Sequence, residues 1–267
     1  MCIRDSNNEN FDAQMQNAAD TANIVVCVGW EFYNVETIAP DYPEVNWIWV
    51  DNATSAPVSN VLNITYAQNE GSYLAGYIAA SMSESGVIGA VGGEDSDTIN
   101  NFIVGYRQGA LYANPEGTVL DPIYTDGDYD SPDKGKEAAL SLYGQGADVV
   151  YAVAGKTGLG VFEAAQEQGR YAIGVDSDQK HINPDVILCS MLKRVGDSVY
   201  DVISRYLEDG TFDGGAIWEA DMSTGLVAVG YGDEETMTQQ VSDELKAEVE
   251  ALAQEIIAGN IVVESTR

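Results

Sequence analysis

One acidic stretch of the chain has the spacing of a calcium-binding loop. Asp126, Asp128, Asp130 and Glu137 occupy the first, third, fifth and twelfth positions of such a loop, where oxygen ligands are required. The sixth position needs glycine for a sharp turn and here holds Ser131, and the preceding segment has the pattern of a strand, not a helix. We therefore interpret the stretch as a solvated loop that leads into a helix.

A second stretch contains part of a phosphate-binding pattern. Residues 155–157, Gly-Lys-Thr, match the end of a phosphate-binding loop, but the first glycine of that loop is replaced by Val150. The glycines at 155, 158 and 160 also fail the dinucleotide-binding pattern, because its last glycine is replaced by Glu163. Neither a nucleotide hydrolase nor a dinucleotide site is expected here.

The chain has one histidine and three cysteines, which leaves little material for a zinc site or a nucleophilic triad. His181 precedes Pro184 in a polar segment, so we predict an exposed loop residue and not a general base. Cys27 and Cys189 lie in or directly after apolar runs and are expected to be buried strand thiols. A Gly-x-Ser-x-Gly nucleophile elbow is absent from the sequence.

The net charge excludes several classes of partner. The 267 residues include 12 Lys plus Arg against 43 Asp plus Glu, a formal charge of -31. Such a field repels nucleic acids and anionic lipid headgroups, so partners should be neutral or cationic. With 45% hydrophobic residues the chain is expected to fold, and it contains no run of about 20 apolar residues that could span a membrane.

Short apolar runs alternate with helical patterns along the chain, which is typical of an α/β fold with a parallel sheet. We predict helices around Val195 to Tyr206 and around Leu245 to Ile256, and a helix entry at Ser131-Pro132. The predicted strands are 23–28, 47–50, 61–66, 87–91, 119–124, 149–153, 172–175, 186–190 and 226–230.

Six segments of the chain stand in the order and spacing of a known family. They are Gln-Asn-Glu-Gly-Ser-Tyr-Leu-Ala-Gly-Tyr at 68–77, Gly-Gly at 92–93, Ser-Pro-Asp-Lys-Gly-Lys-Glu at 131–137, Gly-Val-Phe-Glu-Ala-Ala at 160–165, Ile-Gly-Val-Asp-Ser-Asp-Gln at 173–179 and Ser-Met-Leu-Lys-Arg-Val at 190–195. Together they resemble the basic membrane protein family, the solute-binding lipoproteins of the purine-nucleoside-receptor type. The resemblance runs from about residue 23 to about residue 230.

The resemblance implies a fold like that of the type I periplasmic binding proteins. Two doubly wound parallel-sheet lobes would share hinge crossings and close on a ligand in the cleft between them. We expect the first lobe to comprise residues 1–66 and about 190–267, and the second to comprise residues 67–189.

The same resemblance implies roles for particular residues. Tyr129 would stack on a purine base, and Asp176 and Lys193 would bind the ribose. A carboxylate can accept two hydroxyl hydrogen bonds from a diol, and an ammonium donates to oxygens. Because ligands of open α/β sheets bind beyond the carboxyl ends of the strands, we expect further site residues at strand exits. These are Gly29, Trp30, Asp95 and Gly155.

The chain departs from the family at its beginning. The family's lipoprotein signal and first strand are not found, and Met1 to Ser6 look like translated sequencing-adapter sequence. We therefore expect an N-terminally truncated protein in which strands 24–28 and 47–50 have exposed edges. Lys156 also departs from the family, which would have glycine there.

The resemblance implies an extracytoplasmic solute-binding protein of an ABC-type importer, lipid-anchored to the plasma membrane in its full-length form. It would bind a purine nucleoside, work with a transporter permease, and require neither cofactor, metal nor catalysis. One alternative is an α/β enzyme acting on a nucleoside or sugar, which needs a poised base or nucleophile near Asp176 and Lys193. Another is a ligand-sensing regulatory module of the same fold.

Overall fold

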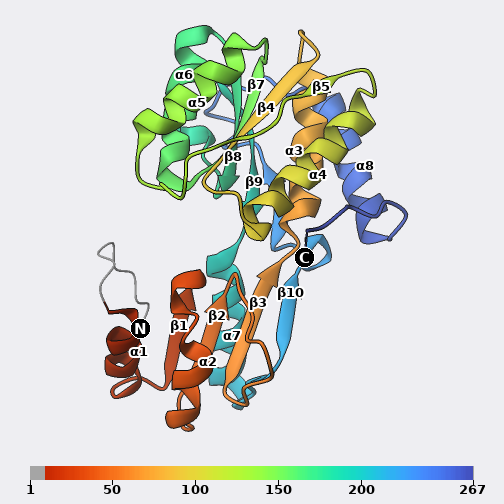
Figure 1. Cartoon of the computed structure of the whole chain (residues 1–267). Helices are drawn as coiled ribbons and strands as arrows, with labels where there is room; N and C mark the ends of the chain where they lie inside the picture. Colours follow the sequence, from red (N-terminus) through yellow and green to blue (C-terminus); the bar gives the residue numbers. More distant parts are fainter. Residues whose placement is uncertain (1–9, 267) are drawn as a thin grey trace. The chain divides into compact units, whose positions relative to one another are not determined.

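The computed structural model describes residues 10–266, and the expectations for Met1 to Ser6 and for Cys2 lie outside the described residues. The chain divides into two compact units (Figure 1). Unit 1 contains the segments up to Tyr66 and Arg194–Ala220, and unit 2 contains Ala67–Lys193 and the segment from Asp221 onward. The chain therefore passes from one unit to the other three times, after Tyr66, Lys193 and Ala220.

Unit 1 is a four-stranded parallel sheet in the order β1-β2-β3-β10, with helices on both faces (Figure 1). Its elements are α1 (Phe11–Ala19), β1 (Ile24–Val28), η1 (Trp30–Phe32), α2 (Val35–Ile38), η2 (Ala39–Asp41), β2 (Asn46–Val50), β3 (Val61–Tyr66), α7 (Val195–Asp209) and β10 (Ile217–Ala220).

The core of unit 1 follows from the alternation of side chains along its strands. Val25 and Cys27 of β1 and Trp47 and Trp49 of β2 point to one face, where they pack with α1 and α2. Asn60 ties the loop before β2 to β3, because its amide donates to three backbone carbonyls at 2.9–3.0 Å. These contacts hold the amino ends of β2 and β3 in register.

The expectation that residues 47–50 have an exposed edge is wrong. β2 pairs with β1 on one side and with β3 on the other, in continuous parallel register. Among the described residues β1 is an edge strand, since β2 is its partner in the sheet. Its Val28 is 40% exposed.

Unit 2 is a seven-stranded sheet in the order β11-β9-β8-β7-β4-β5, with β6 also paired to β4. The strands are parallel except for β11, which runs antiparallel to β9. The strands are β4 (Val87–Gly92), β5 (Thr118–Val119), β6 (Ile123–Tyr124), β7 (Val149–Val153), β8 (Tyr171–Asp176), β9 (Ile187–Lys193) and β11 (Val227–Gly230). The helices are α3 (Gln68–Met82), α4 (Asp97–Ala113), α5 (Pro132–Gly144), η3 (Gly155–Gly158), α6 (Leu159–Gln168), η4 (Lys180–Ile182), η5 (Met222–Thr224) and α8 (Asp243–Ile257).

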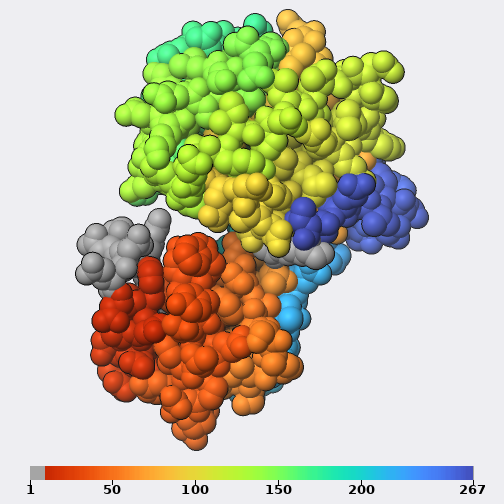
Figure 2. All heavy atoms as spheres, in the orientation of Figure 1, coloured from red at the N-terminus to blue at the C-terminus, as the bar shows by residue number. Residues whose placement is uncertain are grey.

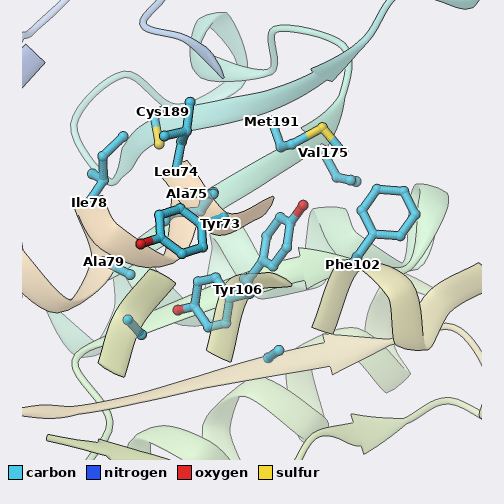
Figure 3. Close-up of a cluster of buried hydrophobic side chains, with 14 of the residues drawn as sticks. Tyr73, Leu74, Ala75, Ile78, Ala79, Phe102, Tyr106, Val175, Cys189 and Met191 are labelled. Atoms are coloured by element: carbon cyan, nitrogen blue, oxygen red, sulfur yellow. The ribbon is translucent and has the colours of Figure 1, made fainter. Parts of the chain in front are cut away.

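Two apolar clusters cover the two faces of the unit 2 sheet. Along β7, Tyr151 and Val153 belong to the cluster formed with α3, α4 and α8, whereas Val150 and Ala152 belong to the cluster formed with α5 and α6. Figure 3 shows part of the first cluster, in which the rings of Tyr73, Tyr106 and Phe102 lie among aliphatic side chains. The sheet is thus buried on both faces, as a parallel sheet requires.

Helices α3 and α4 approach each other closely because three glycines stand at their contact. A Cβ at Gly76 would lie 1.9 Å from the carbonyl oxygen of Tyr106, and one at Gly109 would lie 1.9 Å from that of Tyr73. At Gly105 the distance to the carbonyl oxygen of Asn69 would be 2.1 Å. The middle of α4, the helix that follows β4, is therefore held firmly against α3.

The chain from Asp221 onward belongs to unit 2 and not, as expected, to the lobe that contains the N-terminal region, whereas Arg194–Ala220 does belong to unit 1. β11 pairs with β9 from Lys193 to Ser190, and α8 packs on α3. The last described residues lie against α4, where Gln108 accepts from the amide N–H of Glu264 at 2.8 Å and Asn101 accepts from that of Thr266 at 3.1 Å (Figure 2). The expected return at about residue 190 lies close to the observed crossing after Lys193.

Most predicted strands are present, with two differences. Strand β10, Ile-Trp-Glu-Ala at 217–220, is absent from the prediction: its side chains alternate between exposed and more buried, but its residue types do not alternate. The predicted strand 119–124 is instead two short strands, β5 and β6, since Pro122 between them has no N–H for the ladder. The helices predicted around Val195 to Tyr206 and around Leu245 to Ile256 are confirmed as α7 and α8.

Candidate functional site

Asp176 and Lys193 lie together at the carboxyl ends of two neighbouring strands. Asp176 ends β8 and Lys193 ends β9, and the two strands run parallel. Nζ of Lys193 lies 3.7 Å from Oδ1 of Asp176. The Lys193 side chain is 6% exposed, whereas that of Asp176 is 51% exposed. The pair therefore presents an accessible carboxylate beside a buried ammonium.

Phe102 of α4 provides a second partner for the ammonium. Nζ of Lys193 lies 5.3 Å from the centroid of the Phe102 ring. Phe102 is 1% exposed and belongs to the apolar cluster of Figure 3. The face of an aromatic ring attracts a cation, and more strongly where water is excluded. Phe102 thus offsets part of the cost of burying Lys193.

The backbone at Asp176 is in the left-handed region, with φ of +64°. Residues other than glycine rarely adopt this conformation, which costs about 1–3 kcal/mol unless the surroundings impose it. The neighbouring residues do so, because Val175 N–H donates to Oε1 of Gln179 at 2.8 Å and Ser177 N–H donates to the carbonyl of Val175 at 2.8 Å. Strain of this kind concentrates at functional sites.

Tyr129 lies in the loop between β6 and α5, and its ring packs against a glycine. A Cβ at Gly93 would be 2.0 Å from Cε1 of Tyr129, so no other residue fits there without moving the ring. Gly155 has φ of +55°, and a Cβ at that position would be 3.3 Å from the Tyr129 carbonyl oxygen. Tyr129 as a whole residue is half-buried.

Asp95 lies in the loop that connects β4 to α4. Its Oδ1 accepts from Nδ2 of Asn100 at 2.7 Å, and Oδ1 of Asn100 accepts from the hydroxyl of Tyr124 at 2.6 Å. Burial raises the pKa of Tyr124, and the charge of Asp95 raises it further. The Asp95 side chain is exposed but held in one orientation.

Five of the seven predicted site residues lie at one edge of the unit 2 sheet. They follow or end β4, β6, β7, β8 and β9, and the carboxyl ends of parallel strands share an edge. These residues are Asp95, Tyr129, Gly155, Asp176 and Lys193. Gly29 and Trp30 follow β1 and belong to unit 1.

Gly29 and Trp30 lie at the carboxyl edge of the unit 1 sheet. Gly29 has φ of +107°, and its carbonyl accepts from Nε1 of Trp49 at 2.9 Å. Trp30 is 60% exposed, and Asp51, which follows β2 at the same edge, has φ of +70°. A cavity of about 470 Å³ in unit 1 lies elsewhere, between α7 and β10, and none of the seven predicted residues lines it.

Sequence reasoning missed two residues that support this site. Phe102 lies at helical spacing from Ile99 and Tyr106, so its pattern indicates only a core position. Thr157 ends the partial phosphate-binding pattern and is fully buried beneath the Tyr129 loop, to which it makes three hydrogen bonds. A buried threonine in a loop has no sequence signal of its own.

The alternatives raised by single motifs also have definite outcomes. In the acidic loop, Asp128 pairs with Lys134 at 2.8 Å and Asp130 pairs with Lys156 at 2.8 Å. Within residues 10–266, no group of three or more His, Cys, Asp or Glu is arranged to hold a metal ion. The Ser131 hydroxyl donates to Asp128 and does not cap α5, although Pro132 does occupy the first turn of that helix.

The predictions for Cys27, Cys189 and His181 are confirmed. Cys27 and Cys189 are buried, and burial raises the pKa of the Cys189 thiol to about 12. His181 is exposed, and its Nδ1 lies 2.9 Å from the carbonyl of Asp178. Lys180 is fully buried with its ammonium donating to the carbonyls of Ile187 and Leu188 and to Gln240, and this burial lowers its pKa.

A search for membrane-spanning helices among residues 10–266 finds none with the length and apolar character to cross a bilayer.

Comparisons with known proteins agree with the fold and the sequence motifs. The family model described as ABC transporter substrate-binding protein PnrA-like matches residues 5–267. Basic membrane protein A1 of Borrelia garinii subsp. bavariensis is 32% identical over 98% of this chain and 77% of its own length. A solute-binding protein of an ABC transporter system from Aeropyrum pernix K1 superposes with a TM-score of 0.84 at 27% identity, over 97% of this chain and 83% of that one.

A second solved structure shows the same fold at lower identity. The ABC transporter solute-binding protein from Conexibacter woesei superposes with a TM-score of 0.77 at 24% identity, over 99% of this chain and 87% of that one. The two sheets, their strand orders and these superpositions are those of a type I periplasmic-binding-protein-like fold. The full-length family match and the relatives at about 30% identity confirm the resemblance seen in the sequence: the chain belongs to the Bmp family of PnrA-like ABC transporter substrate-binding proteins.

Proposed function

We propose that this substrate-binding protein takes a purine nucleoside, with the ribose bound by Asp176 and Lys193. The observation that carries the proposal is the 3.7 Å contact between Lys193 and Asp176, in which an accessible carboxylate lies beside a lysine side chain that is 6% exposed. A carboxylate has acceptor positions for both hydroxyls of a ribose diol, and the ammonium can donate to a ring or hydroxyl oxygen. Because Lys193 is already desolvated, a ligand oxygen gains a charge-assisted hydrogen bond without a further large desolvation cost.

The base is assigned to the ring of Tyr129. Stacking on an aromatic face needs a flat partner and tolerates different bases. Tyr129, Asp176 and Lys193 belong to loops or strand ends at one edge of the unit 2 sheet, which supports a single ligand that uses all three.

A substrate-binding protein of an ABC transporter binds a small molecule outside the cytoplasm and works with the transporter components. We place this chain in nucleoside import and propose that the full-length protein is anchored to the plasma membrane by a lipid. Import requires that the ligand is bound and released unchanged, so no residue is assigned a catalytic role.

A thermal-shift screen of nucleosides, free bases, sugars and amino acids tests the ligand class. A ligand at about 100 times its Kd should add roughly 2.7 kcal/mol to the free energy of unfolding. We expect stabilisation by purine nucleosides and a clear loss of that effect in Asp176→Asn. Stabilisation by amino acids or by sugars alone, with no response to nucleosides, would contradict the assignment.

The absence of catalysis has its own test. Chromatography of adenosine and inosine after prolonged incubation with the protein should recover the nucleosides intact. Release of free base or ribose at a rate proportional to protein concentration, and lost in Asp176→Asn, would instead support the enzyme alternative.

A further inference from the structure

Thr157 is buried in η3 and connects the exit of β7 to the loop that carries Tyr129. Its hydroxyl donates to the carbonyl of Asp128 at 2.7 Å and accepts from the N–H of Ser131 at 2.9 Å. Its backbone N–H donates to the carbonyl of Tyr129 at 3.1 Å. Thr157 therefore bonds to the loop at the residue before Tyr129, at Tyr129 itself and two residues after it.

An apolar group in place of the hydroxyl would remove the acceptor of the Ser131 N–H and one of the two threonine donors to the Asp128 carbonyl. Thr157 is 0% exposed, so solvent water does not reach it to replace the hydrogen bonds of its hydroxyl. The single proton of the Thr125 hydroxyl is shared between the Asp128 carbonyl at 3.0 Å and the Gly93 carbonyl at 3.1 Å. The two threonines thus hold the Asp128 carbonyl from two sides and link the loop to the glycine that contacts the Tyr129 ring.

Thr157 is itself fixed by close helix contacts. A Cβ at Gly135 of α5 would lie 1.9 Å from the carbonyl oxygen of Thr157, and one at Gly160 of α6 would lie 1.8 Å from that of Pro132. Glycine at both positions lets α5, η3 and α6 approach until their backbones touch. The hydroxyl of Thr157 is therefore presented from a rigid base.

The ion pairs of the same loop contribute much less to its position. Lys134 with Asp128 and Lys156 with Asp130 have side-chain exposures between 29% and 72%. Exposed pairs of this kind contribute about 0–1 kcal/mol and are screened by salt. The buried hydroxyl contacts, and not the charged ones, decide where the loop lies.

We propose that Thr157 is a positioning residue for ligand stacking, which holds the Tyr129 ring in its binding orientation before the ligand arrives. The inference rests on the proposed function, since it assigns the base to Tyr129. A ring that is already ordered avoids the ordering cost of about 0.5–1.5 kcal/mol for an immobilised side chain, which is about 2- to 13-fold in Kd. Thr157 would act through Tyr129 alone and touch no part of the ligand.

The test is a double-mutant cycle on nucleoside affinity, measured by calorimetry with guanosine and adenosine. Thr157→Val keeps the side-chain shape and the backbone bond to Tyr129 but removes both hydroxyl bonds. We expect it to raise Kd by about 2- to 13-fold in the parent and to have no further effect in Tyr129→Ala. Thr157→Ser, which keeps the hydroxyl, should restore the parent affinity.

A matched control separates positioning from general loss of stability. Thr54 of unit 1 is also buried, and its hydroxyl accepts from Nδ2 of Asn63 at 3.3 Å. Thr54→Val should lower the melting temperature without changing nucleoside affinity. If Thr157→Val does not fold, Thr125→Val removes the other hydroxyl on the same carbonyl and should show the same dependence on Tyr129.

The outcomes separate this inference from the proposed function. If Tyr129→Ala weakens binding but Thr157→Val weakens it equally in both backgrounds, or in neither, the positioning role is wrong and the proposed function stands. If Tyr129→Ala leaves nucleoside affinity unchanged, the base is not stacked on Tyr129 and the positioning role is wrong, while nucleoside binding stands. If no nucleoside binds, both proposals fall.

Discussion

The ammonium of Lys193 lies 5.3 Å from the centre of the Phe102 ring, inside the apolar cluster that α3 and α4 form on the sheet. A cation over an aromatic face in a desolvated position is stabilised by up to about 2 kcal/mol. The contact links α4 to the end of β9.

Phe102→Leu keeps an apolar side chain and removes the aromatic face. In urea unfolding, a cycle of Phe102→Leu and Lys193→Met should show a coupling of about 0.5–2 kcal/mol. Additive effects of the two substitutions would show that the ring contributes packing alone.

The left-handed backbone at Asp176 predicts an unusual order of stability among its variants. Glycine adopts φ of +64° freely, whereas alanine does not, and both remove the carboxylate. Asp176→Gly should therefore be more stable than Asp176→Ala by about 1 kcal/mol in urea unfolding. Equal stability of the two variants would mean that the loop relaxes to another conformation when the carboxylate is lost.

Gly93→Ala should weaken ligand binding indirectly, because it displaces the ring of Tyr129. The new Cβ would lie 2.0 Å from Cε1 of Tyr129, so the ring must move. We expect nucleoside affinity to fall as far as it does in Tyr129→Ala, by roughly 1–3 kcal/mol. Gly144→Ala serves as the control, because a Cβ at Gly144 meets no atom within 4 Å, and titration calorimetry should show parent affinity for it.

Replacement by phenylalanine should affect stability differently at Tyr106 and at Tyr151. Their ring centroids are 5.0 Å apart, but the Tyr151 hydroxyl bonds to the Ser72 hydroxyl at 3.1 Å, while that of Tyr106 is buried with no hydrogen-bond partner in residues 10–266. Tyr151→Phe should cost about 1 kcal/mol of stability, and Tyr106→Phe should be neutral or stabilising. Denaturant unfolding of the two variants checks the difference, and a loss on Tyr106→Phe as large as that on Tyr151→Phe would refute it.

Asp128 predicts a pH dependence at the acidic end. Its hydrogen bond from Lys134, with a further bond from Ser131, lowers the pKa of Asp128 from 3.8 to about 2. A carboxyl with a lower pKa in the folded state stabilises the fold above its unfolded pKa, and this contribution is lost as the pH falls through the folded pKa. Asp128→Asn should therefore flatten the pH dependence of the urea midpoint between about pH 4 and pH 2, whereas Asp126→Asn, the control for one lost charge in the same loop, should not.

The strands could be predicted because each of the long ones is an apolar run that the sheet buries on one or both faces. Asp176 and Lys193 could be brought together from the sequence because their family motifs end adjacent strands. The strain at Asp176 could not be predicted, since it depends on hydrogen bonds that Gln179 and Ser177 make with Val175, which the residue types alone do not indicate.

The supporting residues escaped sequence analysis for a physical reason. Phe102 and Thr157 act through contacts with residues far away in the chain, and their types are ordinary for a core helix and a loop. The C-terminal region was assigned to the wrong lobe because the antiparallel pairing of β11 with β9 depends on tertiary contacts. Strand β10 has four residues, including Glu219, and Ile217 is 59% exposed, so it has no long buried apolar run that would indicate a strand.

The pairing of β10 with β3 also determines the order in which the protein can fold during synthesis. Ile217 lies opposite Asn63, and all of Ala67–Lys193 is translated between them. Because domains fold as their residues leave the ribosome, the sheet of unit 2 can assemble from β4 to β9 while unit 1 still lacks its last strand. The free edge of β3 is then exposed throughout that interval, and it is the nascent chain, more than the finished protein, that needs protection from strand-to-strand association.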